Sequence, residues 1–117
     1  MIQLKRVYEP PNKDDGFRIL VERLWPRGLS KQRAQVDLWL KDISPSPQLR
    51  TWYGHELTKW QEFQRRYRAE LENNLAVRQL QQLLQDKPVI TFVYAARDAE
   101  HNSAQVLKGF LEEHSGS

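Results

Sequence analysis

The 117-residue sequence contains no cysteine, which excludes disulfide bonds, thiolate catalysis and cysteine-ligated zinc. Glycine is scarce, and its five copies are scattered singly. The chain therefore lacks both the GxGxxG fingerprint of dinucleotide-binding folds and the Walker A loop of P-loop NTPases. The three histidines, His55, His101 and His114, lie too far apart for a metal spacing such as HExxH. We therefore expect no metal and no cofactor.

Long apolar segments are also absent. The first residues lack the hydrophobic stretch of a signal peptide, and the run VITFVYAA is too short to cross a bilayer. We expect a soluble, cytoplasmic protein without a membrane partner. The chain is still 39% hydrophobic, so it can bury a core, and its length suits one domain. That domain is expected over residues 1–113, followed by a frayed tail at 114–117.

The net charge of +3 is unevenly distributed along the chain. Residues 1–35 contain eight Lys or Arg and four Asp or Glu, whereas residues 36–117 contain ten and eleven. Such a surplus suits an anionic partner, which includes a phosphate, a nucleotide or a nucleic acid. A modestly basic solvated face is the commoner meaning of this pattern.

The first third of the chain has the pattern of short strands. Partial alternation predicts a strand at 2–8, and an Ile/Leu/Val run predicts a second strand at about 17–24, which Pro26 terminates. Residues 36–41 alternate again and indicate a third strand. A helix over 31–42 is the alternative for that segment.

Four helices are expected in the remainder of the chain. They cover residues 46–54, 58–73, 75–85 and 99–113. The first has Ser46 as its cap and Gly54 as its left-handed stop, and Asp98 is a natural N-cap for the last. In the second, aromatic residues recur at spacings of three and four, which is more often core than a base-stacking platform.

The run VITFVYA at residues 89–95 is continuously β-branched or aromatic, as in a strand buried on both faces. We expect it to be the central strand. A helix, a doubly buried strand and another helix together indicate an α/β fold. The expected architecture is a single layered domain, with a small mixed, partly parallel sheet flanked by helices.

Two polar segments follow predicted strands, namely WPRG at 25–28 and ARDAEHN at 96–102. In open α/β sheets, ligands bind at the carboxyl ends of strands, and the planar arginine fork suits phosphate or carboxylate. These exits could present Arg23, Arg27, Lys31, Arg97, His101 and Asn102 to one cleft. WPRG has a purely structural alternative, in which Trp25 packs, Pro26 stops the strand and Gly28 makes the turn.

His101 is the candidate for acid or base chemistry, because it follows the central strand and imidazole titrates near neutrality. No serine lies in a GxSxG context, and no carboxylate pair has a specific spacing. The residues therefore leave catalysis open.

Four ordered blocks together resemble the YeaO-like family, bacterial proteins that share domain of unknown function 488. The blocks are FRILVERLWPRG, WLKDISPS, LRTWYGH with its following W..F..RY..EL, and YAARDAEHNSAQVLK. The resemblance covers nearly the whole chain. It implies a small cytoplasmic single-domain α/β protein.

The resemblance also implies recurring polar positions. They correspond here to Arg23, Arg27, Lys41, Ser46, Arg50, His55, Tyr94, Arg97 and Asn102. Three positions depart from the family pattern: Glu22 stands where Asp is favoured, Tyr53 where Phe is favoured, and Ser103 where a second Asn is frequent. Longer relatives carry a Cys-His-Arg motif after the equivalent central strand, and a thiol-dependent activity could not be carried over to this cysteine-free chain.

Two hypotheses follow. In the first, a basic cleft at strand carboxyl ends binds a small phosphorylated or carboxylated ligand, with His101 or Tyr94 as proton carrier if a reaction occurs. Its ligand-binding residues would be Arg23, Arg27, Ser46, Arg50, His55, Arg97 and Asn102. In the second, the basic N-terminal third binds nucleic acid or a protein, with Trp25 or Trp39 available for stacking.

Overall fold

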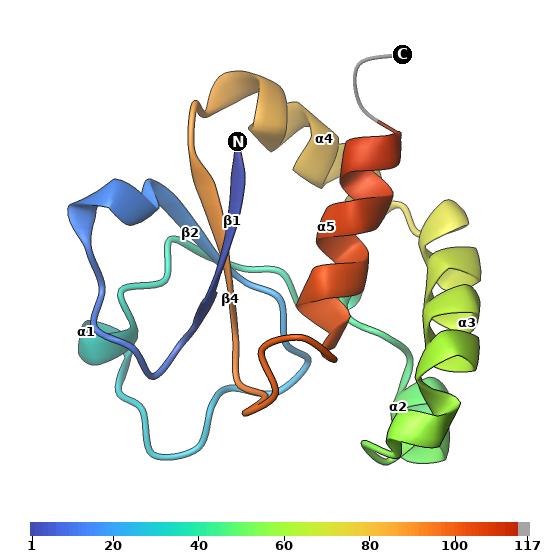
Figure 1. Cartoon of the computed structure of the whole chain (residues 1–117). Coiled ribbons are helices and arrows are strands. Elements are labelled where there is room, and N and C mark those ends of the chain that lie inside the picture. Colours follow the sequence, from blue (N-terminus) through green and yellow to red (C-terminus); the bar gives the residue numbers. More distant parts are fainter. Residues whose placement is uncertain (115–117) are drawn as a thin grey trace.

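A four-stranded sheet organises the chain in the computed structural model, which describes residues 1–114 (Figure 1). The strands run in the order β1-β4-β2-β3, and all three pairings are parallel. Their bounds are Ile2–Arg6 for β1, Phe17–Leu20 for β2, Leu38–Trp39 for β3 and Ile90–Tyr94 for β4. The α/β class is confirmed. The sheet is wholly parallel instead of mixed, because crossover connections and not hairpins join its paired strands.

The central position predicted for the apolar run is confirmed. Strand β4 lies between β1 and β2, and all five of its residues are buried. Phe92, for example, is paired with Leu4 on one side and with Ile19 on the other. Because neighbouring strands and layers enclose it completely, β4 tolerates an uninterrupted apolar sequence.

The outer strands are shorter than the sequence predicts. Strand β1 ends at Arg6 and not at residue 8, and β2 ends at Leu20 and not at residue 24. Beyond β2, the Glu22 carboxylate accepts the N–H of Ala95 at 2.9 Å. A side chain thus takes the place of a backbone acceptor, and the main chain is free to leave the sheet.

The segment at 31–42 combines both alternatives that its sequence offered. A one-turn helix, α1 (Lys31–Ala34), is capped by Ser30 and is followed by the two-residue strand β3. Gln35 separates them with a left-handed backbone (φ 47°), which ends the helix before a second turn forms.

The longer helices follow their sequence patterns closely. They are α2 (Pro47–Tyr53), α3 (Trp60–Glu72), α4 (Ala76–Asp86) and α5 (Ser103–Glu113). Ser46 and Gly54 (φ 53°) cap α2 as expected. The α3 residues Phe63, Tyr67 and Leu71 are each at most 3% exposed, so the aromatic stripe belongs to the core.

The predicted start of the last helix was wrong. Helix α5 begins at Ser103, and its N-cap is Asn102, whose Oδ1 accepts the N–H of Gln105. Asp98 instead accepts the N–H groups of Glu100 and His101, which folds residues 98–101 into a turn of their own. Both side chains are good caps, and Asp98 satisfies nearer donors first.

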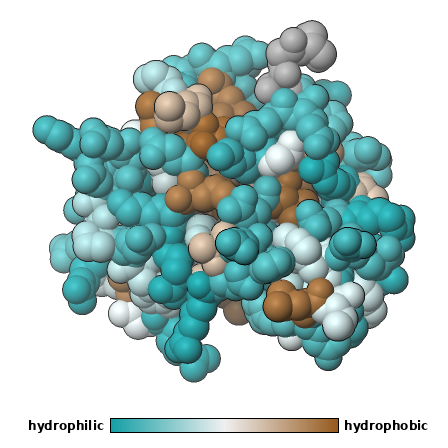
Figure 2. All heavy atoms as spheres, viewed as in Figure 1, coloured by the Kyte–Doolittle hydropathy of each residue, from teal (hydrophilic) through white to brown (hydrophobic). Residues whose placement is uncertain are grey.

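Two hydrophobic cores lie on opposite faces of the sheet. Helices α2 to α5 cover one face and form the larger core, whereas α1 lies on the other side (Figure 1). There, Val7, Leu20, Ala34 and Val93 form a smaller cluster under Trp25, Trp39 and neighbouring residues. On the face in Figure 2, hydrophilic side chains prevail and hydrophobic residues form small separate groups.

The remaining structural expectations concern the membrane and the chain end. None of the helices between residues 1 and 114 has the length and apolar composition needed to cross a bilayer. Of the expected tail at 114–117, residues 115–117 lie outside the described residues. His114 stacks on Phe110 with ring centroids 4.1 Å apart.

Candidate functional site

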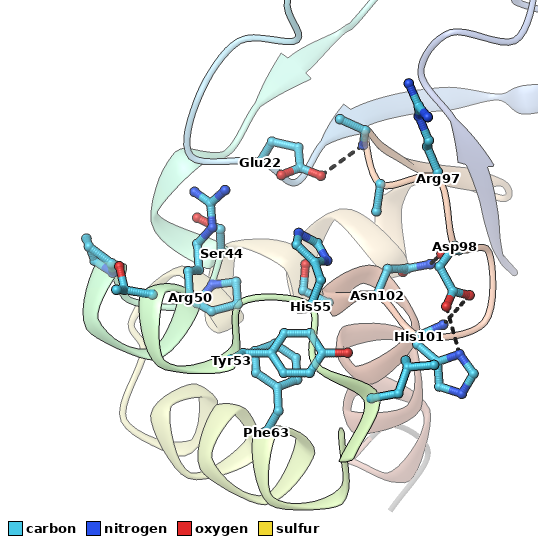
Figure 3. A pocket seen from close by; sticks show the side chains of 17 residues that line it. Glu22, Ser44, Arg50, Tyr53, His55, Phe63, Arg97, Asp98, His101 and Asn102 are labelled. Atoms are coloured by element: carbon cyan, nitrogen blue, oxygen red, sulfur yellow. Dashed lines mark hydrogen bonds and ion pairs between the residues drawn. The ribbon is translucent and has the colours of Figure 1, made fainter. Parts of the chain in front are cut away.

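A cleft of about 900 Å³ opens at the carboxyl end of the parallel sheet (Figure 3). One wall contains Glu22, which follows β2. Residues between 44 and 57, around helix α2, form a second wall, and residues 95–103, between β4 and α5, form the third. The cleft therefore lies where parallel α/β sheets commonly bind ligands, at loops that follow adjacent strands.

Two arginines stand on opposite sides of this cleft. Arg50 projects from α2 and Arg97 from the loop after β4, and both are exposed (Figure 3). Within residues 1–114, neither guanidinium group forms a hydrogen bond or an ion pair. Both forks are therefore available to an anion, for which guanidinium is a strong and directional partner.

His55 lies between the two arginines and has a left-handed backbone with φ of 59°. It directly follows Gly54, so two consecutive residues take this conformation at the end of α2. A non-glycine residue adopts it at an energetic cost. The resulting turn places the imidazole in the cleft, with its ring centroid 5.8 Å from that of Tyr53.

Glu22 introduces a carboxylate into this cationic setting. One of its oxygens accepts the Ala95 N–H, and burial raises the pKa of the carboxyl group above its ordinary value. The Ala95 hydrogen bond and the charges of Arg50 and His55 act in the opposite direction and lower this pKa in part. The cleft thus contains a half-buried acid close to Arg50 and His55.

Tyr53 forms part of the cleft lining and is only 5% exposed. Its ring stacks on Phe63 with centroids 4.4 Å apart, while its buried hydroxyl has no hydrogen-bond partner among residues 1–114. Burial, and then the charge of Asp98, raise the pKa of this phenol. In the sequence, the only signal that distinguishes Tyr53 is its departure from the Phe that the family pattern favours.

Asp98 and His101 form a pair in the turn that precedes α5. The His101 Nδ1 lies 2.9 Å from the Asp98 carboxylate, and the imidazole ring packs edge-on against Trp60. The N–H groups of Glu100 and His101 lower the pKa of Asp98, and the His101 side chain lowers it further. The ring is thereby oriented, with its Nε2 not engaged by Asp98.

Two further candidate residues form hydrogen bonds within the protein. Asn102 belongs to the cleft lining, and Arg23 does not. Asn102 uses its amide to cap α5 and to donate to the Asp98 carbonyl. Arg23 donates to the carbonyls of Ser44 and Pro45, each at 3.3 Å, and so ties the exit of β2 to the wall that precedes α2.

Besides Arg23, three of the candidate ligand-binding and proton-carrier residues lie outside the cleft lining. Ser46 caps α2 and donates to Glu70 at 2.6 Å. Tyr94 is 4% exposed at the end of β4. Arg27 is exposed, and its carbonyl accepts the hydroxyl of Tyr8. The structure thus brings together Arg50, His55, Arg97, His101 and Asn102, and it leaves these three aside.

The WPRG segment has a structural role at the exit of β2. The Trp25 indole donates to the Leu29 carbonyl and meets Trp39 edge-on with centroids 5.4 Å apart, while Pro26 is buried. Gly28 provides the positive φ of the turn. The segment closes the smaller core on the sheet face opposite α2 to α5.

Metal ligation has no candidate group in the part of the chain that the structure describes, where no three His, Asp or Glu side chains are clustered suitably.

Comparison with known proteins gives a consistent result. Residues 1–116 match a family model described as the inactive DUF488-N3 subclade. The uncharacterized protein Rv3073c of Mycobacterium tuberculosis is 40% identical over 110 residues, which cover 94% of this chain and 92% of the relative. The uncharacterized protein YeaO of Escherichia coli is 40% identical over 111 residues, which cover 94% and 96%. No solved structure matches the chain significantly.

Proposed function

Because this chain belongs to the YeaO-like DUF488 family, whose matched relatives are named only as uncharacterised proteins, we propose a function from the cleft itself: it binds a small phosphorylated or carboxylated ligand. The observation that carries the proposal is the pair of exposed, unpartnered guanidinium groups of Arg50 and Arg97 at the mouth of one cleft. Bidentate hydrogen bonds from such groups are the usual way in which proteins hold phosphate and carboxylate.

The size and position of the cleft support a small-molecule ligand. Its volume of about 900 Å³ falls within the range of roughly 300–1,000 Å³ that is typical of such sites. The lining also includes apolar side chains, among them Leu57 and Phe63, which can contact the body of a ligand while the arginines hold its anionic group.

We propose binding without turnover. The matched subclade is described as inactive, and this description favours a binding protein over an enzyme. Of the two proton-carrier candidates, His101 lines the cleft and Tyr94 does not. His101 is therefore the residue to replace in any search for a reaction.

The proposal is tested by measuring thermal shifts with a panel of phosphates and carboxylates, followed by calorimetry on each hit. Arg50→Ala and Arg97→Ala are each expected to weaken binding at least tenfold, since a hydrogen bond to a charged group contributes about 1.5–3 kcal/mol. Arg27→Ala is the matched control, because Arg27 is exposed but lies outside the cleft lining.

Unchanged affinity in both cleft variants, or a loss confined to Arg27→Ala, would contradict this assignment. A loss confined to Arg27→Ala would instead place the ligand-binding site at the exit of β2.

A further inference from the structure

Two polar groups in the cleft remain unused when Arg50 and Arg97 hold an anion. They are the hydroxyl of Tyr53 and the second carboxylate oxygen of Glu22. Each has a chemical requirement that an inorganic anion does not satisfy.

The Tyr53 hydroxyl is a buried donor without an acceptor among residues 1–114. In Figure 3 its oxygen points across the cleft toward the side that carries Asn102 and His101. Leaving a buried donor unpaired costs more free energy than an average hydrogen bond contributes. A ligand oxygen that accepts from this hydroxyl therefore contributes strongly to the binding free energy. The stacked Phe63 ring fixes the phenol in this direction.

Glu22 has the complementary requirement. Its Oε2 accepts the Ala95 N–H, and no side chain among residues 1–114 donates a hydrogen bond to either of its oxygens. A carboxylate has about four acceptor positions, so most of its capacity is available. It also repels a second anion at this position and instead accepts a hydrogen bond from a hydroxyl or amine.

We infer that Glu22 and Tyr53 determine specificity by binding hydroxyl groups, so that the ligand is a polyol or sugar that carries a phosphate or carboxylate. A hydroxyl group donates to Glu22 and accepts from Tyr53, so one kind of group satisfies both residues. The anion lies on the arginines at the mouth, and the hydroxylated body extends into the cleft. This inference rests on the proposed function and adds the class of ligand.

The experiment compares ribitol 5-phosphate with pentyl phosphate by calorimetry, because these probes share a five-carbon chain and differ in their hydroxyl groups. Wild type is expected to prefer ribitol 5-phosphate by about tenfold or more, since a site built for hydroxyl groups rejects an analogue that lacks them. Tyr53→Phe and Glu22→Gln are each expected to reduce that preference, which is the ratio of the two affinities measured in the same variant.

Both variants conserve local structure. Phe retains the stacking on Phe63, and the Gln carbonyl still accepts the Ala95 N–H. Tyr8→Phe is the matched control, because it removes a hydroxyl that binds the Arg27 carbonyl outside the cleft, and the preference is expected to persist in it.

Each remaining outcome is informative. Equal affinity of wild type for the two probes, with both lost in Arg97→Ala, would overturn this inference and leave the proposed function standing. A preference that persists in Tyr53→Phe and Glu22→Gln would also overturn it. Failure of both probes to bind would contradict the proposed function, and the inference with it.

Discussion

Glu22 contributes both to the fold, at the end of β2, and to the lining of the cleft. Its carboxylate ends β2 by accepting the Ala95 N–H, and the same group faces the cleft. Burial raises its pKa in the folded protein, so the folded state retains this proton to a higher pH than the unfolded state does. The contribution of Glu22 to the free energy of unfolding therefore falls as the pH rises from the unfolded pKa through the folded pKa.

Glu22→Gln is expected to reveal this dependence. The variant carries no titrating group at this position, so its melting temperature relative to wild type is expected to rise between pH 4 and pH 7. Thermal unfolding of both proteins at one-unit intervals measures the difference, and other titrations common to the two proteins cancel. A melting-temperature difference that stays constant over this range would show that burial does not raise the pKa of Glu22.

Helix α2 supplies two residues of the cleft lining, Arg50 and Tyr53. The position of this helix depends on Ser46. The Ser46 hydroxyl accepts the N–H of Leu49 and donates to Glu70, and its own N–H is bound by the same carboxylate. One side chain therefore starts α2 and ties it to α3. This double role gives Ser46 a structural function that requires no contact with a ligand.

Ser46→Ala is expected to lower the free energy of unfolding by about 1–2 kcal/mol, because it removes the cap and the hydrogen bond to Glu70. Ser46→Thr retains the hydroxyl and is expected to recover most of the loss. Urea denaturation measures the stability, and calorimetry with the ligand measures the affinity, which is expected to change little. A tenfold loss of affinity without a loss of stability would instead make Ser46 a ligand-contacting residue.

Across the whole molecule, much of the N-terminal basic surplus is used internally. Lys5 and Arg18 pair with the buried Asp15, and Arg6 donates to the carbonyls of Ala95 and Ala96. Arg23 likewise binds two carbonyls. Fewer basic side chains are therefore available to contact a nucleic acid than the sequence count implies.

The remaining basic side chains between residues 27 and 33 are Arg27, Lys31 and Arg33, all exposed. If they contact three phosphates, affinity for a DNA duplex is expected to fall about 40-fold between 50 and 200 mM salt. We expect this weak, salt-sensitive behaviour in fluorescence anisotropy, and its loss when all three are changed to Ala. Tight binding that persists at 200 mM salt would favour the nucleic-acid hypothesis over the small-ligand proposal.

The sequence by itself determined the features that depend on neighbouring residues. The Ser46 and Gly54 caps of α2, the buried stripe of α3 and the doubly buried β4 all follow from capping chemistry or from a periodic apolar pattern. The YeaO-like resemblance rests on ordered blocks of the same local kind. Each of these predictions is confirmed, because short-range interactions leave a signal within a few residues.

Only the tertiary structure decided which polar groups share a cleft. Arg50 and Arg97 line the same cleft although they are far apart in the sequence, whereas Arg27 lies outside the cleft although it also follows a strand. The unpartnered hydroxyl of Tyr53 depends on distant neighbours as well. The physical reason is that hydrogen-bond satisfaction belongs to the packed molecule, and the sequence around a residue does not contain its partners.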